Sequence, residues 1–108
     1  MASKHPVIDP ELLRGAAGQA VGVMKLLANE ERMLLLCQLS QGEMCVSELE
    51  EALAIRQPTL SQQLAVLRNE GVVATRREGK NIYYTVTDPA LVQILALLYR
   101  LYCNAGEK

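Results

Sequence analysis

A polar-faced helix followed directly by a basic hairpin, within residues 57–86, is the feature that most constrains the fold of this chain. Leu60, Leu64 and Leu67 recur at helical spacing and are expected to point inward, which leaves amide and hydroxyl side chains on the outside. Residues 72–77 and 82–86 are predicted to form two strands around a turn at residues 78–81. A helix that can enter a groove, beside basic strands that can rest on phosphates, is typical of DNA binding.

Four more helices are predicted from capping signals and apolar periodicity. They cover residues 9–28, 30–41, 48–53 and 89–103, and are opened by Asp9-Pro10, Asn29, a capping box at Ser47, and Asp88-Pro89. In the helix of residues 57–71, Pro58 is expected at the first position and Gly71 just past the end. The prediction is a mainly α fold with a small β-hairpin, a winged helix-turn-helix in which four helices precede the hairpin and one follows it.

The length of 108 residues suits one small domain. We expect residues 1–8 to form a flexible N-terminal arm and residues 9–108 to form a domain for DNA binding and dimerisation. No apolar run reaches the length of a membrane span, and the N-terminus has no apolar signal region, so we expect a cytoplasmic protein without membrane contact.

Charge is distributed unevenly along a chain whose net charge is −1. Residues 29–51 hold six acids and one base, a net of −5, whereas residues 52–87 hold five bases and two acids, a net of +3. One face can therefore attract phosphate although the whole molecule is near neutral. Two solvated surfaces without a partner are the alternative.

The last helix carries more apolar surface than a small core needs. Its two apolar stripes are Leu91, Leu95, Leu98 and Tyr102, and Val92, Ala96, Tyr99 and Cys103. We interpret the excess, together with the first helix, as a homodimer interface, the alternative being a larger core.

In these segments the sequence resembles the ArsR/SmtB family of bacterial repressors. The resemblance spans roughly residues 12–103 and rests on residues 27–32, 42–49, 57–67 and 76–84 in this order and spacing. It implies a dimeric repressor that binds an inverted repeat in double-stranded DNA and leaves it when an inducer binds.

The expected DNA contacts lie on the helix of residues 57–71 and on the hairpin. Gln62 and Gln63 could pair with adenine edges, whereas Thr59 and Ser61 could reach bases or phosphates. The remaining expected contacts are Arg56 and Gln57 at the start of the helix, Arg68 near its end, and Arg76, Arg77 and Lys80 in the hairpin.

The three cysteines, Cys37, Cys45 and Cys103, are too few and scattered for a secreted disulfide framework. The positions of Cys37 and Cys103 resemble those in the branch of the family that responds to sulfide and persulfide. This resemblance implies that the two thiols react with low-molecular-weight persulfides or polysulfides to form a bridge that releases DNA. The alternative is that Cys37 is a small buried core residue.

Metal sensing is the competing interpretation for the same cysteines. Some relatives bind soft metals through a Cys-Val-Cys motif, but this chain has Cys45-Val46-Ser47, and its only histidine is His5. We therefore expect no metal site and no cofactor. A metal(loid)- or general redox-responsive regulator, a counter-silencing activator and a protein-interaction module remain open. The absence of a phosphate loop and of a Cys–His pair argues against an enzyme.

Overall fold

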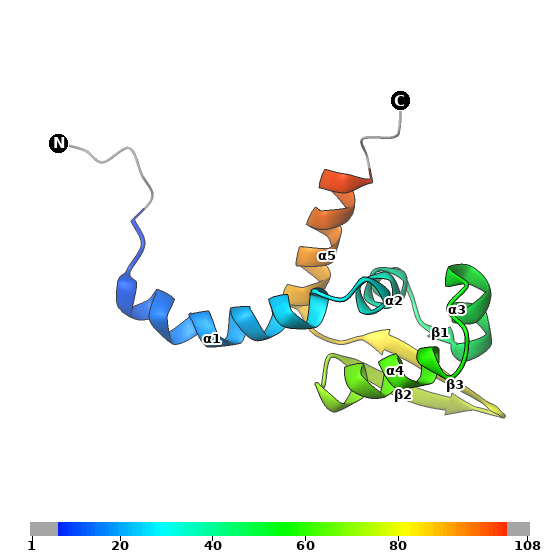
Figure 1. The fold of residues 1–108 in the computed structure, drawn as a ribbon. Helices are drawn as coiled ribbons and strands as arrows, with labels where there is room; N and C mark the ends of the chain where they lie inside the picture. Colours follow the sequence, from blue (N-terminus) through cyan, green and yellow to red (C-terminus); the bar gives the residue numbers. More distant parts are fainter. Residues whose placement is uncertain (1–6, 104–108) are drawn as a thin grey trace.

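The computed structural model describes residues 7–103 and contains five helices and three short strands (Figure 1). The elements in chain order are α1 (Pro10–Leu27), α2 (Glu30–Ser40), β1 (Met44–Cys45), α3 (Val46–Leu53), α4 (Thr59–Asn69), β2 (Val73–Glu78), β3 (Asn81–Val86) and α5 (Pro89–Tyr102). The predicted fold class is confirmed, since a short sheet and the α3–α4 pair form a winged helix-turn-helix.

Local capping explains most helix boundaries. The carboxylate of Asp9 accepts from the backbone N–H of Glu11, and that of Asp88 accepts from the N–H of Ala90, which opens α1 and α5 as predicted. Asn29 Oδ1 accepts from the N–H of Arg32 and caps α2. Gly71 follows α4 with a φ of +76°, a left-handed conformation that glycine adopts without steric cost.

Two predicted helix starts were wrong by one or two residues. The third helix begins at Val46, and its capping carboxylate is that of Glu48, which accepts from the backbone N–H of Cys45 at 3.0 Å. The capping box expected at Ser47 does not form because Cys45, still extended in β1, already serves as the N-cap. Pro58 is likewise the N-cap of α4, whose first residue is Thr59.

The sheet has one strand more than expected. Its order is β1-β3-β2, and β1 pairs antiparallel with β3 through Met44 opposite Tyr84 and Cys45 opposite Tyr83. The β2–β3 hairpin turns at Gly79, whose φ is +63°. This additional strand, β1, pairs the segment before α3 with the hairpin, so the hairpin is anchored to the helix-turn-helix.

Leucines from α2, α3, α4 and α5 form the core. The side chains with under 2% exposure are Leu35, Leu36, Leu39, Leu49, Leu60, Leu64, Leu67, Leu91 and Leu95. The three α4 leucines predicted to point inward are all among them. The opposite side of α4 is consequently directed to solvent.

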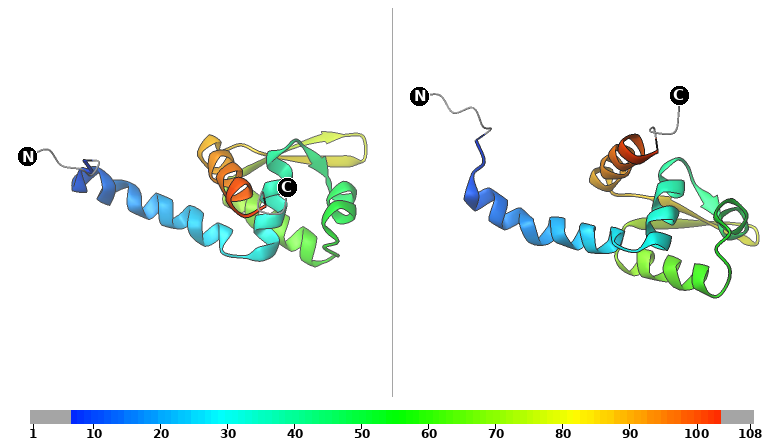
Figure 2. Two further views of the ribbon diagram at one scale, coloured as in Figure 1. Left: turned by 90° about the horizontal axis from the view of Figure 1, so that it is seen from above. Right: turned by 45° about the horizontal axis from the view of Figure 1, so that its top comes forward.

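Helix α1 contributes little to this core. Only Leu26 and Leu27 of α1 are buried, and the rest of the helix extends away from the body of the molecule (Figures 1 and 2). Leu12 and Met24 of α1 and Leu101 and Tyr102 of α5 are more than half exposed. A single chain thus leaves the apolar surface of α1 and of the second half of α5 uncovered, as expected for a surface that pairs with a second copy.

Candidate nucleic-acid interface and thiol site

The start and outer side of α4 form the candidate DNA-reading surface. Ser61 and Gln62 are exposed and Thr59 is partly exposed, so the structure places all three where a groove could reach them. Arg56 and Arg68 are exposed near the two ends of this surface. These five predicted residues lie together on one element and the turn before it.

Gln57 has a structural task at the same helix terminus. Its side-chain Oε1 accepts from the backbone N–H of Ser61 at 3.1 Å. Pro58 has no side-chain acceptor, so Gln57 satisfies a donor that the N-cap residue leaves unpaired. Gln57 therefore orders the start of α4, and its amide nitrogen remains available to DNA.

Gln63 is placed differently from its neighbour Gln62. It is partly buried, and its Nε2 donates to Glu31 Oε1 at 3.1 Å and to Asn29 Oδ1 at 3.2 Å. Its Oε1 accepts from Arg32 Nη1 at 3.4 Å. The side chain predicted to read a base is thus turned toward the start of α2, and no local sequence pattern indicated these contacts.

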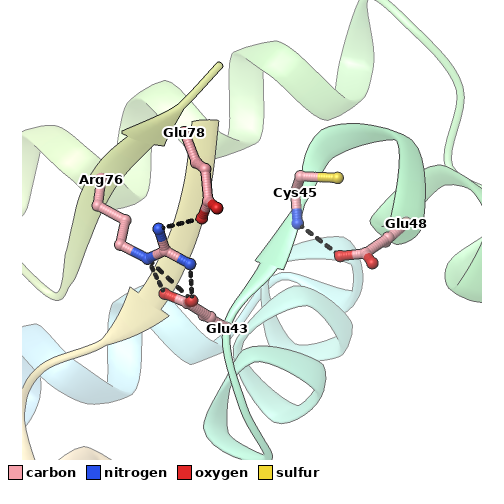
Figure 3. A network of polar contacts seen from close by, with 5 residues as sticks. All are labelled: Glu43, Cys45, Glu48, Arg76 and Glu78. Atoms are coloured by element: carbon pink, nitrogen blue, oxygen red, sulfur yellow. Dashed lines mark hydrogen bonds and ion pairs between the residues drawn. The ribbon is translucent and has the colours of Figure 1, made fainter. Parts of the chain in front are cut away.

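The wing carries three predicted cations, of which Arg76 is held by carboxylates. Its guanidinium donates to Glu43 Oε2 at 3.0 Å and to Glu78 Oε1 at 2.6 Å, as Figure 3 shows. Arg76 also lies 4.8 Å from the centre of the ring of Tyr83, its partner across the strands.

The ion pairs shift the pKa of a carboxylate, Glu43, and of the guanidinium, Arg76, in opposite directions. The hydrogen bond from Arg76 lowers the pKa of Glu43, and the bonds to Glu43 and Glu78 raise the pKa of Arg76. Arg77 and Lys80 are exposed on the same hairpin. The wing therefore offers these two side chains to phosphate more readily than Arg76.

Cys37 and Cys103 share one apolar hollow between α2 and α5. Its volume is about 580 Å³, and its lining consists of Met33, Leu34, Cys37, Gln38, Leu53, Leu98, Tyr99, Tyr102 and Cys103. Cys37 is partly buried on α2, and Cys103 is exposed at the C-cap of α5. The fold thus brings together two thiols that lie far apart in the sequence.

The environments of the two thiols differ. Burial raises the pKa of the Cys37 thiol, and the negative charge of the nearby Cys103 thiolate raises it further. A thiol with a raised pKa holds less thiolate near neutral pH and is the weaker nucleophile. Its exposure makes Cys103 the thiol that a reagent in solution can reach first.

Cys45 lies apart from this pair. It is buried in β1, and its Sγ is 3.4 Å from the hydroxyl oxygen of Ser47. Within residues 7–103, no three His, Cys, Asp or Glu side chains lie close enough together to hold a metal ion. His5, considered as a ligand in the sequence, lies outside the described residues. None of the helices in the described range combines the length and hydropathy needed to cross a bilayer.

The α3–α4 pair, the exposed side of α4 and the hairpin with Arg77 and Lys80 define a winged-helix DNA-binding regulator. The family model for bacterial regulatory proteins of the arsR family matches residues 29–75. The biofilm growth-associated repressor of Agrobacterium fabrum is 49% identical over 85 residues, which are 79% of this chain and 73% of that protein. The corresponding repressor of Xylella fastidiosa (strain 9a5c) is 41% identical over 96% of this chain and 90% of its own length.

Solved structures agree with this match. The crystal structure of the transcriptional repressor BigR from Xylella fastidiosa superposes with a TM-score of 0.84 at 41% identity, covering 89% of this chain and 98% of that one. HlyU from Vibrio cholerae superposes with a TM-score of 0.77 at 41% identity, over 81% of this chain and 95% of that one. The chain belongs to the ArsR family of bacterial transcriptional regulators, and its partner is double-stranded DNA. These relatives are regulators, and no catalytic family is indicated.

Proposed function

We propose that the protein is a homodimeric repressor that binds an inverted-repeat operator and releases it when persulfides oxidise Cys37 and Cys103. The observation that carries the proposal is the shared apolar hollow, which both thiols line. The similarity to biofilm growth-associated repressors supports the repressor role. Since a relative is also named a transcriptional activator, the direction of control is part of the proposal and not of the family assignment.

The chemistry requires two transfers and no bound cofactor. The Cys103 thiolate attacks the terminal sulfur of a persulfide RSSH, forming Cys103–S–SH and releasing the thiolate RS⁻. The Cys37 thiolate then attacks the Cys103 sulfur, which forms the Cys37–Cys103 disulfide and expels HS⁻. The two thiols are oxidised and one sulfane sulfur is reduced to sulfide. A second persulfide RSSH would instead convert the Cys37 thiolate to Cys37–S–SH and release a second RS⁻. Attack of the Cys103–S–S⁻ anion on the Cys37 sulfur then forms a trisulfide bridge and expels HS⁻.

The bridge can act on DNA through α5. Bridging draws α2 toward the second half of α5, whose exposed Leu101 and Tyr102 belong to the proposed dimer surface. A shift of one protomer against the other changes the separation of the two α4 helices, which must match half-sites about one helical turn apart. A ~100-fold loss of operator affinity requires only about 2.7 kcal/mol of coupling.

Operator binding and mass spectrometry together test the proposal. The protein is exposed separately to a persulfide donor, glutathione disulfide and hydrogen peroxide, and the bridged cysteines are mapped by digestion. We expect Cys37→Ser and Cys103→Ser to stay on DNA in the presence of persulfide, and the control Cys45→Ser to release it like the parent protein. Release by either of the first two variants would refute the paired-thiol mechanism.

A further inference from the structure

A hydrogen-bond network joins the end of α1 to the middle of α4 through a single arginine. Arg32 Nε donates to the carbonyl oxygen of Leu26 at 2.9 Å, and its Nη2 donates to that of Lys25 at 3.4 Å. Both carbonyls belong to the last turn of α1, and that of Lys25 also accepts from the backbone N–H of Ala28 at 3.2 Å. The third branch of the same guanidinium, Nη1, donates to Gln63 Oε1 on α4 at 3.4 Å.

The amide of Gln63 is fully used by this network. Its oxygen faces the guanidinium, and its nitrogen faces the Glu31 carboxylate and the Asn29 amide oxygen. An amide has one acceptor oxygen and two N–H donors, so this orientation satisfies every group, whereas the flipped orientation would set donors against donors. All four side chains are partly buried, which shields these bonds from water.

We propose that Arg32 and Gln63 are positioning residues that fix the recognition helix α4 relative to α1. Arg32 is anchored at the C-terminal end of α1, and a planar guanidinium holds several acceptors in a fixed arrangement. A change in the angle between α1 and α2 must therefore move Arg32, and with it the Gln63 amide. Because α1 carries part of the proposed dimer surface, the network links the packing of the dimer to the placement of α4. Only this last link rests on the proposed function.

This role predicts a pattern that a base-reading glutamine would not produce. An operator is selected from a random duplex library with the reduced, unmodified protein, and affinities are then measured for single base-pair changes in it. Gln63→Met keeps the size of the side chain but removes its hydrogen bonds, and Arg32→Lys keeps the charge but not the fork. We expect each to weaken operator binding about tenfold, the equivalent of ~1.4 kcal/mol, with the preference at every base pair retained.

The double variant separates one shared network from two independent roles. If Arg32 and Gln63 act through the same contact, the double variant should bind about as tightly as the weaker-binding of the two single variants, because the second substitution then removes nothing further. Hydrogen–deuterium exchange should also show faster exchange at residues 25–28 and 59–63 together in Arg32→Lys. Gln63→His keeps one donor and one acceptor in its neutral ring, and we expect it to retain most of the affinity of the parent protein. Weak binding by Gln63→Met can then be assigned to the lost hydrogen bonds and not to a general folding defect.

Two outcomes would overturn the inference. One is a relaxed preference at a single base pair per half-site in Gln63→Met, which would make this residue a base reader. The other is full additivity of the two substitutions with unchanged exchange in α4. All measurements use reduced protein, so a failure of the thiol switch would leave them unaffected and would be recognised separately. Gln62→Ala, an exposed neighbour on α4, serves as the control that should alter base preference.

Discussion

The salt dependence of operator binding should distinguish the basic side chains that are free to contact phosphate from Arg76, which is paired with two carboxylates. Five basic side chains lie on α4, its approach and the wing, and both salt bridges found within residues 7–103 belong to one of them, Arg76. Four per protomer therefore remain, or eight per dimer. At about 0.9 per neutralised phosphate, eight contacts give a slope of log K against log salt of roughly −7.

Lys80→Ala removes two of these contacts per dimer and should flatten the slope to roughly −5. When the salt concentration rises from 50 to 200 mM, these slopes correspond to a roughly 10⁴-fold fall in operator affinity for the parent protein and a roughly 10³-fold fall for the variant. Arg76→Ala should leave the slope within about one unit of the parent value, because Glu43 and Glu78 already neutralise that guanidinium. Titrations by fluorescence anisotropy at five or more salt concentrations give each slope directly.

A charge-matched control is available on α1. Arg14 is exposed near the start of that helix, far from the wing along the chain, and Arg14→Ala should leave the slope unchanged. If Arg76→Ala flattened the slope as much as Lys80→Ala, the carboxylates would not hold Arg76 in the bound state and the reasoning would be wrong. An unchanged slope in Lys80→Ala would mean that the wing does not touch phosphate.

Three further predictions concern the wing, the thiols and the core. Glu43→Gln removes one carboxylate from Arg76 and should steepen the salt slope and raise affinity at low salt, as measured in the same titrations. Cys103→Ser removes the negative charge beside Cys37, so the Cys37 pKa should fall and its alkylation by iodoacetamide should reach half-maximal rate at a lower pH than in the parent. Leu36→Ala opens a cavity at a side chain with 0% exposure and should lower the free energy of unfolding by about 3–5 kcal/mol in urea titrations.

Helix positions were predictable because they depend on local signals. Asp9, Asn29 and Asp88 begin helices by accepting backbone hydrogens a few residues away, and the spacing of Leu60, Leu64 and Leu67 defines the buried side of α4. The β1 strand was missed because two residues are too few to show alternation. That strand exists only because β3 supplies its partner, and the same pairing moved the start of α3 to Val46.

The sequence alone therefore determined the order of the helices and the hairpin, the family, and the residues expected to build a DNA-binding surface. The tertiary structure decided which members of that set are free. It turned Gln63 toward Arg32 and placed Arg76 between two carboxylates, whereas Gln62 and Lys80 remained exposed. It also brought the thiols of α2 and α5 into one hollow. The physical reason is that capping and periodicity act over a few residues, whereas these contacts join side chains that only the packed helices bring together.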